Sequence, residues 1–237
     1  MEPIKNIVKM PERRQEESGG THPDSRKLNA NLERIKENIR RGISMKANDL
    51  MGIPERYRGK VLPVKAQREL EAFRKGKSLF LTGIPGSGKT HLAVTLMNEW
   101  LADSMIVGDA VLFPSKGLPM FLPAIDFFLE IKESWRTEES VQANSEKKII
   151  ERYTEKPLLV IDDLGAEKIS DWSRTVGYAL LDRRYRAMKQ TIITSNLSLK
   201  ELAEKLDGRL ASRIAEMGEV VKMADKDYRV ERKHEKT

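Results

Sequence analysis

The segment GIPGSGKT, at residues 83–90 of this 237-residue chain, constrains the possible folds more than any other feature. It fits the pattern G-x-x-x-x-G-K-[ST], and it lies between a short apolar run, SLFLTG (78–83), and a helical stretch that begins at Lys89. The glycines allow successive backbone N–H groups to point at phosphate oxygens, and the helix adds the positive end of its dipole. The sequence therefore predicts an α/β fold that binds a nucleotide where a buried strand ends.

The loop is expected to contribute side chains as well as backbone. Lys89 can reach the β- and γ-phosphates, and the Thr90 hydroxyl can bind Mg²⁺. The guanine-reading motif N-K-x-D does not occur, which favours ATP over GTP. We expect ATP and Mg²⁺ to be bound by the loop and its flanks, at Gly83, Ile84, Pro85, Gly86, Ser87, Gly88, Lys89, Thr90 and His91.

Two aspartates end the apolar run LLVIDD (158–163). Such a run is typical of a strand covered on both faces, and the carboxyl ends of parallel strands border the ligand crevice. Asp162 is therefore expected to position Mg²⁺, and Asp163 to orient or deprotonate the attacking water. Because Asp163 is shorter than the glutamate that many ATPases carry here, we expect slow hydrolysis. The alternative is that the paired aspartates only cap a loop.

Two further segments contain candidate catalytic residues. TIITSN (191–196) predicts a strand ending at Asn196, whose amide could reach the γ-phosphate, although Ser-Asn also simply begins turns. DGRLASRIAEM (207–217) places Arg209 and Arg213 one helical turn apart on one face. An arginine there could reach into the ATP site of a neighbouring chain, or the pair could be surface residues that cap a helix.

Strands and helices alternate along the rest of the chain. This order predicts one five-stranded parallel sheet with helices on both faces. Residues 104–117 are expected to be an insertion, because proline and glycine split their apolar pieces. The remaining predicted strands are 120–123 and 219–223. Helices are predicted at 64–76, 89–101, 124–135, 145–154 and 171–189, and one or two further helices at 198–216.

The N-terminal region differs in composition from the rest of the chain. Residues 1–24 are polar and predict a disordered arm, and a helix is expected to begin at Asp24 or Ser25. Residues 44–63 are expected to form a linker or a short wrapped segment. The helix is expected either to pack on the adjoining domain or to dock in a partner's groove. Both alternatives use its apolar stripe, Leu28, Leu32, Ile35, Ile39 and Ile43.

Composition excludes several classes of protein. The chain has no cysteine and three histidines, so disulfides, thiolate zinc sites and cysteine nucleophiles are excluded, and a histidine metal cluster is not expected. No apolar run has the roughly 20 residues of a membrane span, and the N-terminus lacks a signal sequence, so a cytoplasmic location is expected. The net charge of +7 favours either a nucleic-acid partner or a solvated basic surface.

Several ordered motifs together resemble one family. GSGKTHLA (86–93), LLVIDDLGAE (158–167) and RRYRAMKQTIITSNLS (183–198) resemble the DnaC/IstB-like AAA+ ATPases of bacteria and phages. GRLASRI (208–214), IPERYR (53–58) and DYR (227–229) extend the resemblance over about residues 50–230. It implies a P-loop core with strand order 5-1-4-3-2, a sensor role for Asn196 and an arginine-finger role for Arg213.

The resemblance also implies a function. We expect an ATPase that loads the replicative DNA helicase on single-stranded DNA, with slow hydrolysis that an oligomer or DNA stimulates. The alternative is an IstB-type transposition helper that binds duplex DNA. Lys132 and Arg136, on the helix after the second strand, are the candidate DNA contacts, while Phe128, Ile131 and Trp135 are expected to enter the core.

These expectations divide the chain into three parts. Residues 1–50 form a basic arm and an amphipathic partner-docking helix, residues 51–230 form the AAA+ domain, and residues 231–237 form a charged tail. A replicative helicase, single-stranded DNA and further copies of the chain are the expected partners, with no membrane contact.

Overall fold

The computed structural model describes residues 23–59, 67–108, 111–134, 139–166 and 170–223. Its centre is a five-stranded sheet in the order β4-β5-β6-β1-β7, with every neighbouring pair parallel. Numbered along the chain, these core strands have the order 5-1-4-3-2, so the predicted topology is confirmed. The strands are β1 (Ser78–Thr82), β4 (Met120–Pro123), β5 (Leu158–Asp162), β6 (Gln190–Ser195) and β7 (Gly218–Lys222).

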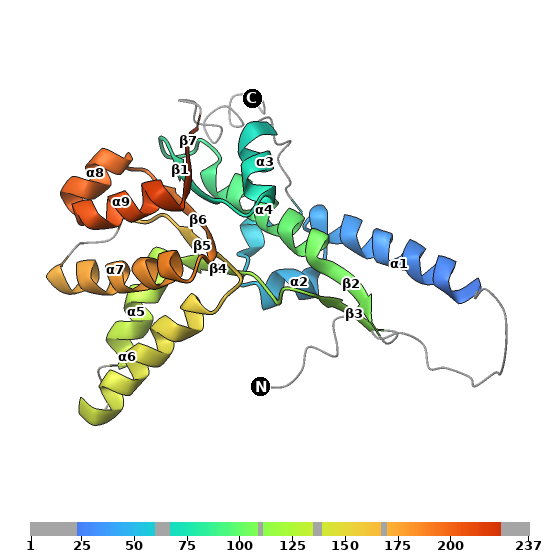
Figure 1. Ribbon diagram of the computed structural model, residues 1–237, viewed down its shortest axis with the longest axis horizontal. Coiled ribbons are helices and arrows are strands. Elements are labelled where there is room, and N and C mark those ends of the chain that lie inside the picture. The colour runs from blue at the N-terminus through green and yellow to red at the C-terminus, as the bar shows by residue number, and fades with distance from the viewer. Residues whose placement is uncertain (1–22, 60–66, 109–110, 135–138, 167–169, 224–237) are drawn as a thin grey trace, which may run out of the picture.

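Helices cover both faces of the sheet (Figure 1). One layer contains α1 (Pro23–Arg40), α2 (Met45–Leu50), η1 (Glu55–Tyr57), α3 (Gln67–Arg74) and α4 (Lys89–Ser104). The other contains α5 (Ala124–Ser134), α6 (Glu139–Thr154), α7 (Asp171–Arg186), α8 (Leu199–Lys205) and α9 (Gly208–Met217). None of the helices in these ranges is long and apolar enough to cross a membrane.

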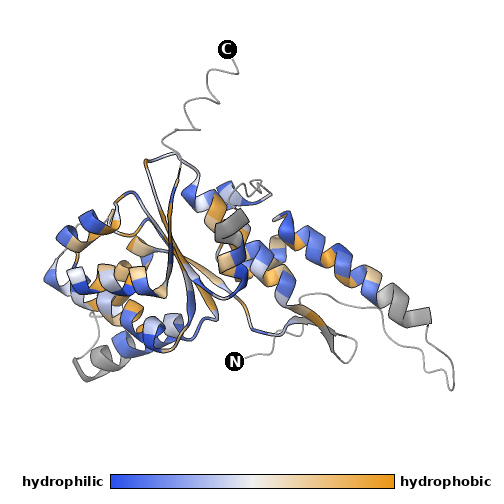
Figure 2. Ribbon diagram, turned by 45° about the horizontal axis from the view of Figure 1, so that its top comes forward, coloured by the Kyte–Doolittle hydropathy of each residue, from blue (hydrophilic) through white to orange (hydrophobic). Residues whose placement is uncertain are grey.

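Alternate residues of the strands supply the two cores. Leu79 and Leu81 of β1 pack under α4, while Phe80 between them packs under the α5–α9 layer. In β5, Val160 faces the α4 layer and Ile161 faces the α5–α9 layer. Because side chains alternate across a strand, a sheet covered on both faces needs apolar residues at nearly every position. Figure 2 accordingly shows hydrophobic residues along the central strands.

The segment expected as an insertion contains a β-hairpin. β2 (Met105–Gly108) and β3 (Val111–Pro114) pair antiparallel, apart from the main sheet. The hairpin lies beside α1, next to the end of α4 (Figure 1). The sequence did not predict these strands, because each is four residues long and the run is broken by Pro114 and Gly117.

Helix α1 packs along α4, which is the first of the two alternatives for its apolar stripe. Ile39 is buried, and Leu32 and Ile35 pack against the same core. Arg40 extends the contact by pairing with Asp103 at 3.0 Å, at the far end of α4. Ile43 is half exposed, so it does not share this burial. The arm predicted for residues 1–24 lies outside the described residues, except for Pro23 and Asp24, the first two residues of α1.

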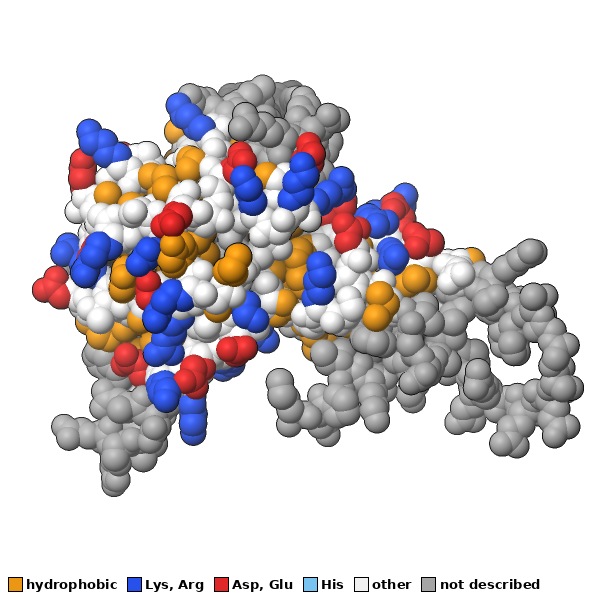
Figure 3. Space-filling model, in the orientation of Figure 1, with side chains coloured by type: hydrophobic (Ala, Val, Ile, Leu, Met, Phe, Trp, Pro, Cys, Tyr) orange, Lys and Arg blue, Asp and Glu red, His pale blue; other side chains and the backbone are white. Residues whose placement is uncertain are grey.

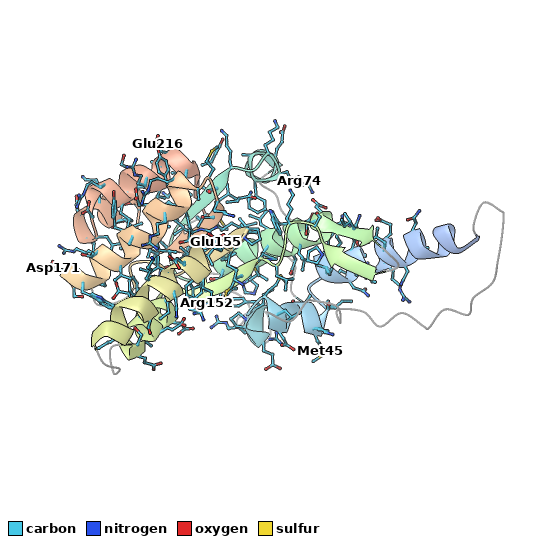
Figure 4. The ribbon with its side chains drawn as sticks, turned by 60° about the horizontal axis from the view of Figure 1, so that its bottom comes forward. Met45, Arg74, Arg152, Glu155, Asp171 and Glu216 are labelled. Atoms are coloured by element: carbon cyan, nitrogen blue, oxygen red, sulfur yellow. The ribbon has the colours of Figure 1, made fainter. Side chains whose placement is uncertain are left out.

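Residues 44–59 wrap around the domain. Met51, Ile53 and Tyr57 are buried, and the Met51 carbonyl accepts a hydrogen bond from the backbone N–H of Phe121 on the edge strand β4. Met45 points away from the molecule (Figure 4). Of the two alternatives for residues 44–63, the structure therefore shows the wrapped segment. The predicted tail, 231–237, lies beyond the last described residue.

Candidate nucleotide-binding site

The glycine-rich loop joins β1 to α4 and curls through three residues with positive φ. Gly83, Gly86 and Gly88 have φ of +154°, +82° and +92°, a region that side chains with a Cβ rarely adopt. Gly88 is the N-cap of α4, and it has no side chain that could occupy the first N–H groups of the helix. The loop therefore presents backbone donors and the positive end of a helix dipole, which together suit phosphate.

Lys89 links this loop to the end of β6. Its ammonium donates to the carbonyl oxygens of Gly83 and Ile84, each at 2.8 Å. It also donates to Oδ1 of Asn196 at 2.8 Å, across more than a hundred residues of sequence. Lys89 is 7% exposed, so its charge is held inside the curl of the loop.

The bonded chain continues from Asn196 to the acidic end of β5. The Asn196 amide donates to Oδ1 of Asp163 at 2.7 Å. Asp163 has φ of +60°, which is uncommon for a residue with a Cβ and is concentrated at functional sites. Three predicted residues, Lys89, Asn196 and Asp163, thus form one continuous network.

Asp162 lies beside this network and is mostly enclosed. Burial raises the pKa of its carboxyl, and hydrogen bonds from Thr194 and Thr90 oppose that shift. The Thr194 hydroxyl donates to Asp162 Oδ1 at 2.7 Å. The structure therefore brings the two predicted magnesium ligands, Thr90 and Asp162, together. Thr194 was missed, because a threonine inside a strand gives no signal in the sequence.

The residues present fit a magnesium–nucleotide complex. The Ser87 hydroxyl is buried in the loop without a hydrogen-bond partner. Buried polar groups are nearly always hydrogen-bonded, so this hydroxyl is available to bond a phosphate oxygen. Among the described residues, no group of three or more His, Cys, Asp or Glu side chains could hold a metal. Thr90 and Asp162 would hold Mg²⁺ with phosphate and water oxygens completing its shell, as is usual for this ion.

His91 connects the loop to the wrapped N-terminal segment. Its ring meets that of Tyr57 edge to face, with 4.8 Å between the centroids. Tyr57 belongs to the IPERYR motif, so this motif lies against the first turn of α4. Ile84 and Pro85 form the exposed outer side of the loop.

Arg213 is placed elsewhere. Its guanidinium pairs with Asp182 of α7 at 3.3 Å and stacks over the ring of Tyr185 at 4.4 Å from the centroid. Arg209, one turn earlier, stacks over Tyr178 in the same manner at 5.3 Å. Within the part of one chain that the structure describes, Arg213 does not join the network around Lys89.

The candidate DNA-binding helix is only partly described. Lys132 is exposed on α5, and Phe128 and Ile131 are buried as expected, while Trp135 and Arg136 lie outside the described residues. On the face shown in Figure 3, Lys and Arg side chains are interspersed with Asp and Glu. This face therefore carries no large patch of one charge.

The sheet order, the loop after β1 and the acidic end of β5 define the P-loop fold of the AAA+ class. The chain belongs to the family of IstB-like ATP binding proteins, whose family model matches residues 60–236. Nucleotide binding is therefore a property of its family.

Relatives of known name match part of the chain. The replicative helicase loader DnaC of Escherichia coli K12 is 26% identical over 151 residues, which are 63% of this chain and 55% of DnaC. The replicative helicase loader DnaI of Bacillus subtilis is 32% identical over 130 residues, 54% of this chain and 36% of DnaI. The chain thus spans about half the length of DnaC, and less of DnaI.

Solved structures agree with this assignment. The crystal structure of the DnaC helicase loader superposes with a TM-score of 0.56 at 27% identity, covering 72% of this chain and all of that one. DnaI gives a TM-score of 0.52 at 26% identity, covering 69% of this chain and 82% of DnaI. The replication initiator DnaA bound to AMPPCP and single-stranded DNA, at 20% identity, shares the fold, with a TM-score of 0.56 over 78% of this chain and 55% of that one.

Proposed function

We propose that this protein hydrolyses ATP and uses its nucleotide state to deliver a replicative helicase to single-stranded DNA. The observation that carries the proposal is the bonded path from Lys89 through Asn196 to Asp163. It connects the group suited to bind the γ-phosphate with the carboxylate suited to act on water. The likeness to the helicase loaders DnaC and DnaI supports the loading role.

In this proposal each residue of the network has a separate task. Lys89 binds the β- and γ-phosphates together with the loop amides. Thr90 and Asp162 hold magnesium, which supplies positive charge that neutralises the phosphates when it is bound. Asp163 orients the attacking water and accepts its proton. Asn196 contacts the γ-phosphate and, through its hydrogen bond to Asp163, couples the position of that carboxylate to the presence of the phosphate.

Arg213 acts in the site of a neighbouring copy. Its contacts with Asp182 and Tyr185, outside the network of its own chain, favour action in trans. Such arginines raise the rate of hydrolysis about 10³–10⁵-fold where measured. Hydrolysis is then slow in a single copy and faster in an oligomer or on DNA.

The contacts with macromolecules complete the proposal. Lys132 on α5, with Arg136 beyond the described residues, pairs with DNA phosphates. The region 1–50 grips the helicase. Since Ile39, Leu32 and Ile35 are used against α4, the helicase meets the outer, charged face of α1.

The proposal is tested by recovering partners from native lysate with ATP present. Wild type should recover a hexameric helicase, and Lys89→Ala should not, while Lys200→Ala, at an exposed position of α8, serves as a control for lost charge. Recovery of a transposase instead would favour the second candidate, a transposition helper acting on duplex DNA, which the IstB-like family match supports. ATP turnover should rise on adding single-stranded DNA, and Arg213→Ala should abolish that turnover.

A separate variant tests whether the short side chain of Asp163 makes ATP hydrolysis slow. The longer side chain of Asp163→Glu should reach the attacking water better and raise turnover several-fold in the assembled protein. Turnover that stays level, with ATP affinity unchanged, would contradict this explanation of the rate.

A further inference from the structure

Thr194 holds three consecutive residues at the acidic end of β5. Its hydroxyl donates to Asp162 Oδ1 at 2.7 Å and accepts from the backbone N–H of Asp163 at 2.8 Å. Its carbonyl oxygen accepts from the backbone N–H of Leu164 at 2.9 Å. Thr194 is 1% exposed, so no solvent competes for these bonds.

The direction of the two hydroxyl bonds is fixed. A hydroxyl has one proton, and the Asp163 N–H can only donate, so the Thr194 proton must point at Asp162. One side chain therefore sets the orientation of one carboxylate and the backbone position of the next.

The bond to Asp163 also explains the unusual backbone there. The last paired residues of β5 and β6 are Ile161 and Ile193, so the regular ladder ends just before the aspartates. Beyond it, the Thr194 side chain takes the N–H of Asp163 in place of a strand carbonyl. Asp163 can then turn to φ of +60° and direct its carboxylate at Asn196 without losing its backbone bond.

We propose that Thr194 is a positioning residue for the reaction, which orients Asp162 toward magnesium and Asp163 toward the attacking water. This inference rests on the proposed ATPase function. Groups that orient metal ligands or catalytic carboxylates typically change metal affinity or activity by about 10–100-fold when removed. In this proposal Thr194 acts only through Asp162 and Asp163, to which it is hydrogen-bonded.

The test separates positioning from a purely structural role. Thr194→Val keeps the shape of the side chain and the Leu164 bond but removes the hydroxyl, and Thr194→Ser restores it. Thr191→Val is the matched control, because Thr191 is a buried threonine on the same strand that bonds Arg184 instead. For each variant, ATP affinity is measured in EDTA and across a magnesium titration, alongside kcat and the urea midpoint of unfolding.

Thr194→Val should bind ATP in EDTA within about twofold of wild type, because the loop and Lys89 are intact. Its magnesium requirement should rise about tenfold and its kcat fall about tenfold, and Thr194→Ser should reverse both. Thr191→Val should lower the urea midpoint and leave the magnesium requirement and kcat unchanged.

The inference is overturned if Thr194→Val keeps its magnesium requirement and kcat within twofold, or if Thr194→Ser fails to rescue them. If Thr194→Val does not fold, Thr194→Ala provides the same two readouts without the added methyl group. A wild-type protein that binds ATP but shows no turnover would instead remove the proposed function.

Discussion

At the scale of single residues, Arg184 of α7 is a fully buried cation that donates mostly to carbonyl oxygens. Its guanidinium donates to the carbonyls of Tyr153 and Lys156 near the end of α6, to the Gln190 carbonyl and to the Thr191 hydroxyl. Burial lowers the pKa of Arg184 to about 9, so it remains charged at neutral pH. Glu155, at the end of α6 (Figure 4), supplies an opposite charge. Arg184 thus joins α6, α7 and β6.

Replacing Arg184 should therefore be costly. Arg184→Met keeps much of the buried volume but leaves several carbonyls unpaired, and we expect a loss of about 3–5 kcal/mol in the free energy of unfolding. Urea unfolding measures this loss. The adjacent Arg183→Met should change stability by no more than about 0.5 kcal/mol. Equal losses in both variants would contradict the structural role given to Arg184.

Gly177 offers the opposite case, because it lies inside α7 where an alanine would fit. An added Cβ would meet Phe128 Cζ at 3.5 Å, an ordinary contact, beside a cavity of about 10 Å³. Gly177→Ala should stabilise the fold by about 0.5–1 kcal/mol, because alanine restricts the unfolded chain and favours a helix. Thermal unfolding checks this value, and a lower melting temperature would contradict it.

Gly218 is the contrasting glycine. Its Cβ would lie 1.8 Å from the Ser78 carbonyl oxygen, where β7 begins against β1. Gly218→Ala should therefore destabilise the protein by about 3 kcal/mol.

The sequence predicted single residues well only where a motif exists. The loop pattern identified Lys89 and Thr90, and the acidic strand end identified Asp162 and Asp163. The structure places these residues together, although their chemical roles stay predictions. Thr194 could not be found, because its importance depends on which strand lies beside β5.

At the scale of elements, α7 and α9 together restrain Arg213. The carboxylate of Asp182 on α7 forms two ion pairs, with Arg213 Nε at 3.3 Å and with Arg186 Nη2 at 2.8 Å. The Asp182 side chain is 13% exposed. Tyr185 supports the guanidinium from its face. Glu216, on the outer side of α9 (Figure 4), is a weaker partner at 3.8 Å. To act on a neighbouring copy, Arg213 would have to leave Asp182.

Weakening the ion pair between Asp182 and Arg213 should raise the ATP turnover of the assembled oligomer. Ion pairs near the surface contribute about 0.2–1 kcal/mol, so Asp182→Asn should increase oligomer turnover by at most about fivefold. Glu216→Gln, which removes the longer pair, should have a smaller effect. If Asp182→Asn lowers turnover as much as Arg213→Ala, then Asp182 positions the arginine instead of restraining it.

Element prediction succeeded where the apolar pattern was long. All five core strands were found within one residue at each end, because strands buried on both faces leave unbroken apolar runs. Helix α6 begins at Glu139, six residues earlier than predicted, since its first turns are polar. The hairpin β2–β3 was missed because its short strands resemble an ordinary broken loop.

At the scale of the whole molecule, nucleotide binding should be visible as stability. A ligand that binds only the folded state stabilises it by about 2.7 kcal/mol at a hundred times its Kd. For a chain of this size that shifts the melting temperature by about 5–10 °C. Wild type should show this shift with ATP and magnesium, and Lys89→Ala should show less than about 2 °C. An equal shift in both proteins would contradict the role of Lys89.

The placement of α4 has a mechanical consequence. The helix begins at the phosphate loop with Lys89, and near its other end Glu99 and Asp103 receive Arg40 of α1. At 1.5 Å per residue its 16 residues span about 24 Å, so a tilt of about 5° at one end moves the other by about 2 Å. A tilt of α4 at the phosphate loop would therefore displace its contact with Arg40 and, with it, the described part of α1.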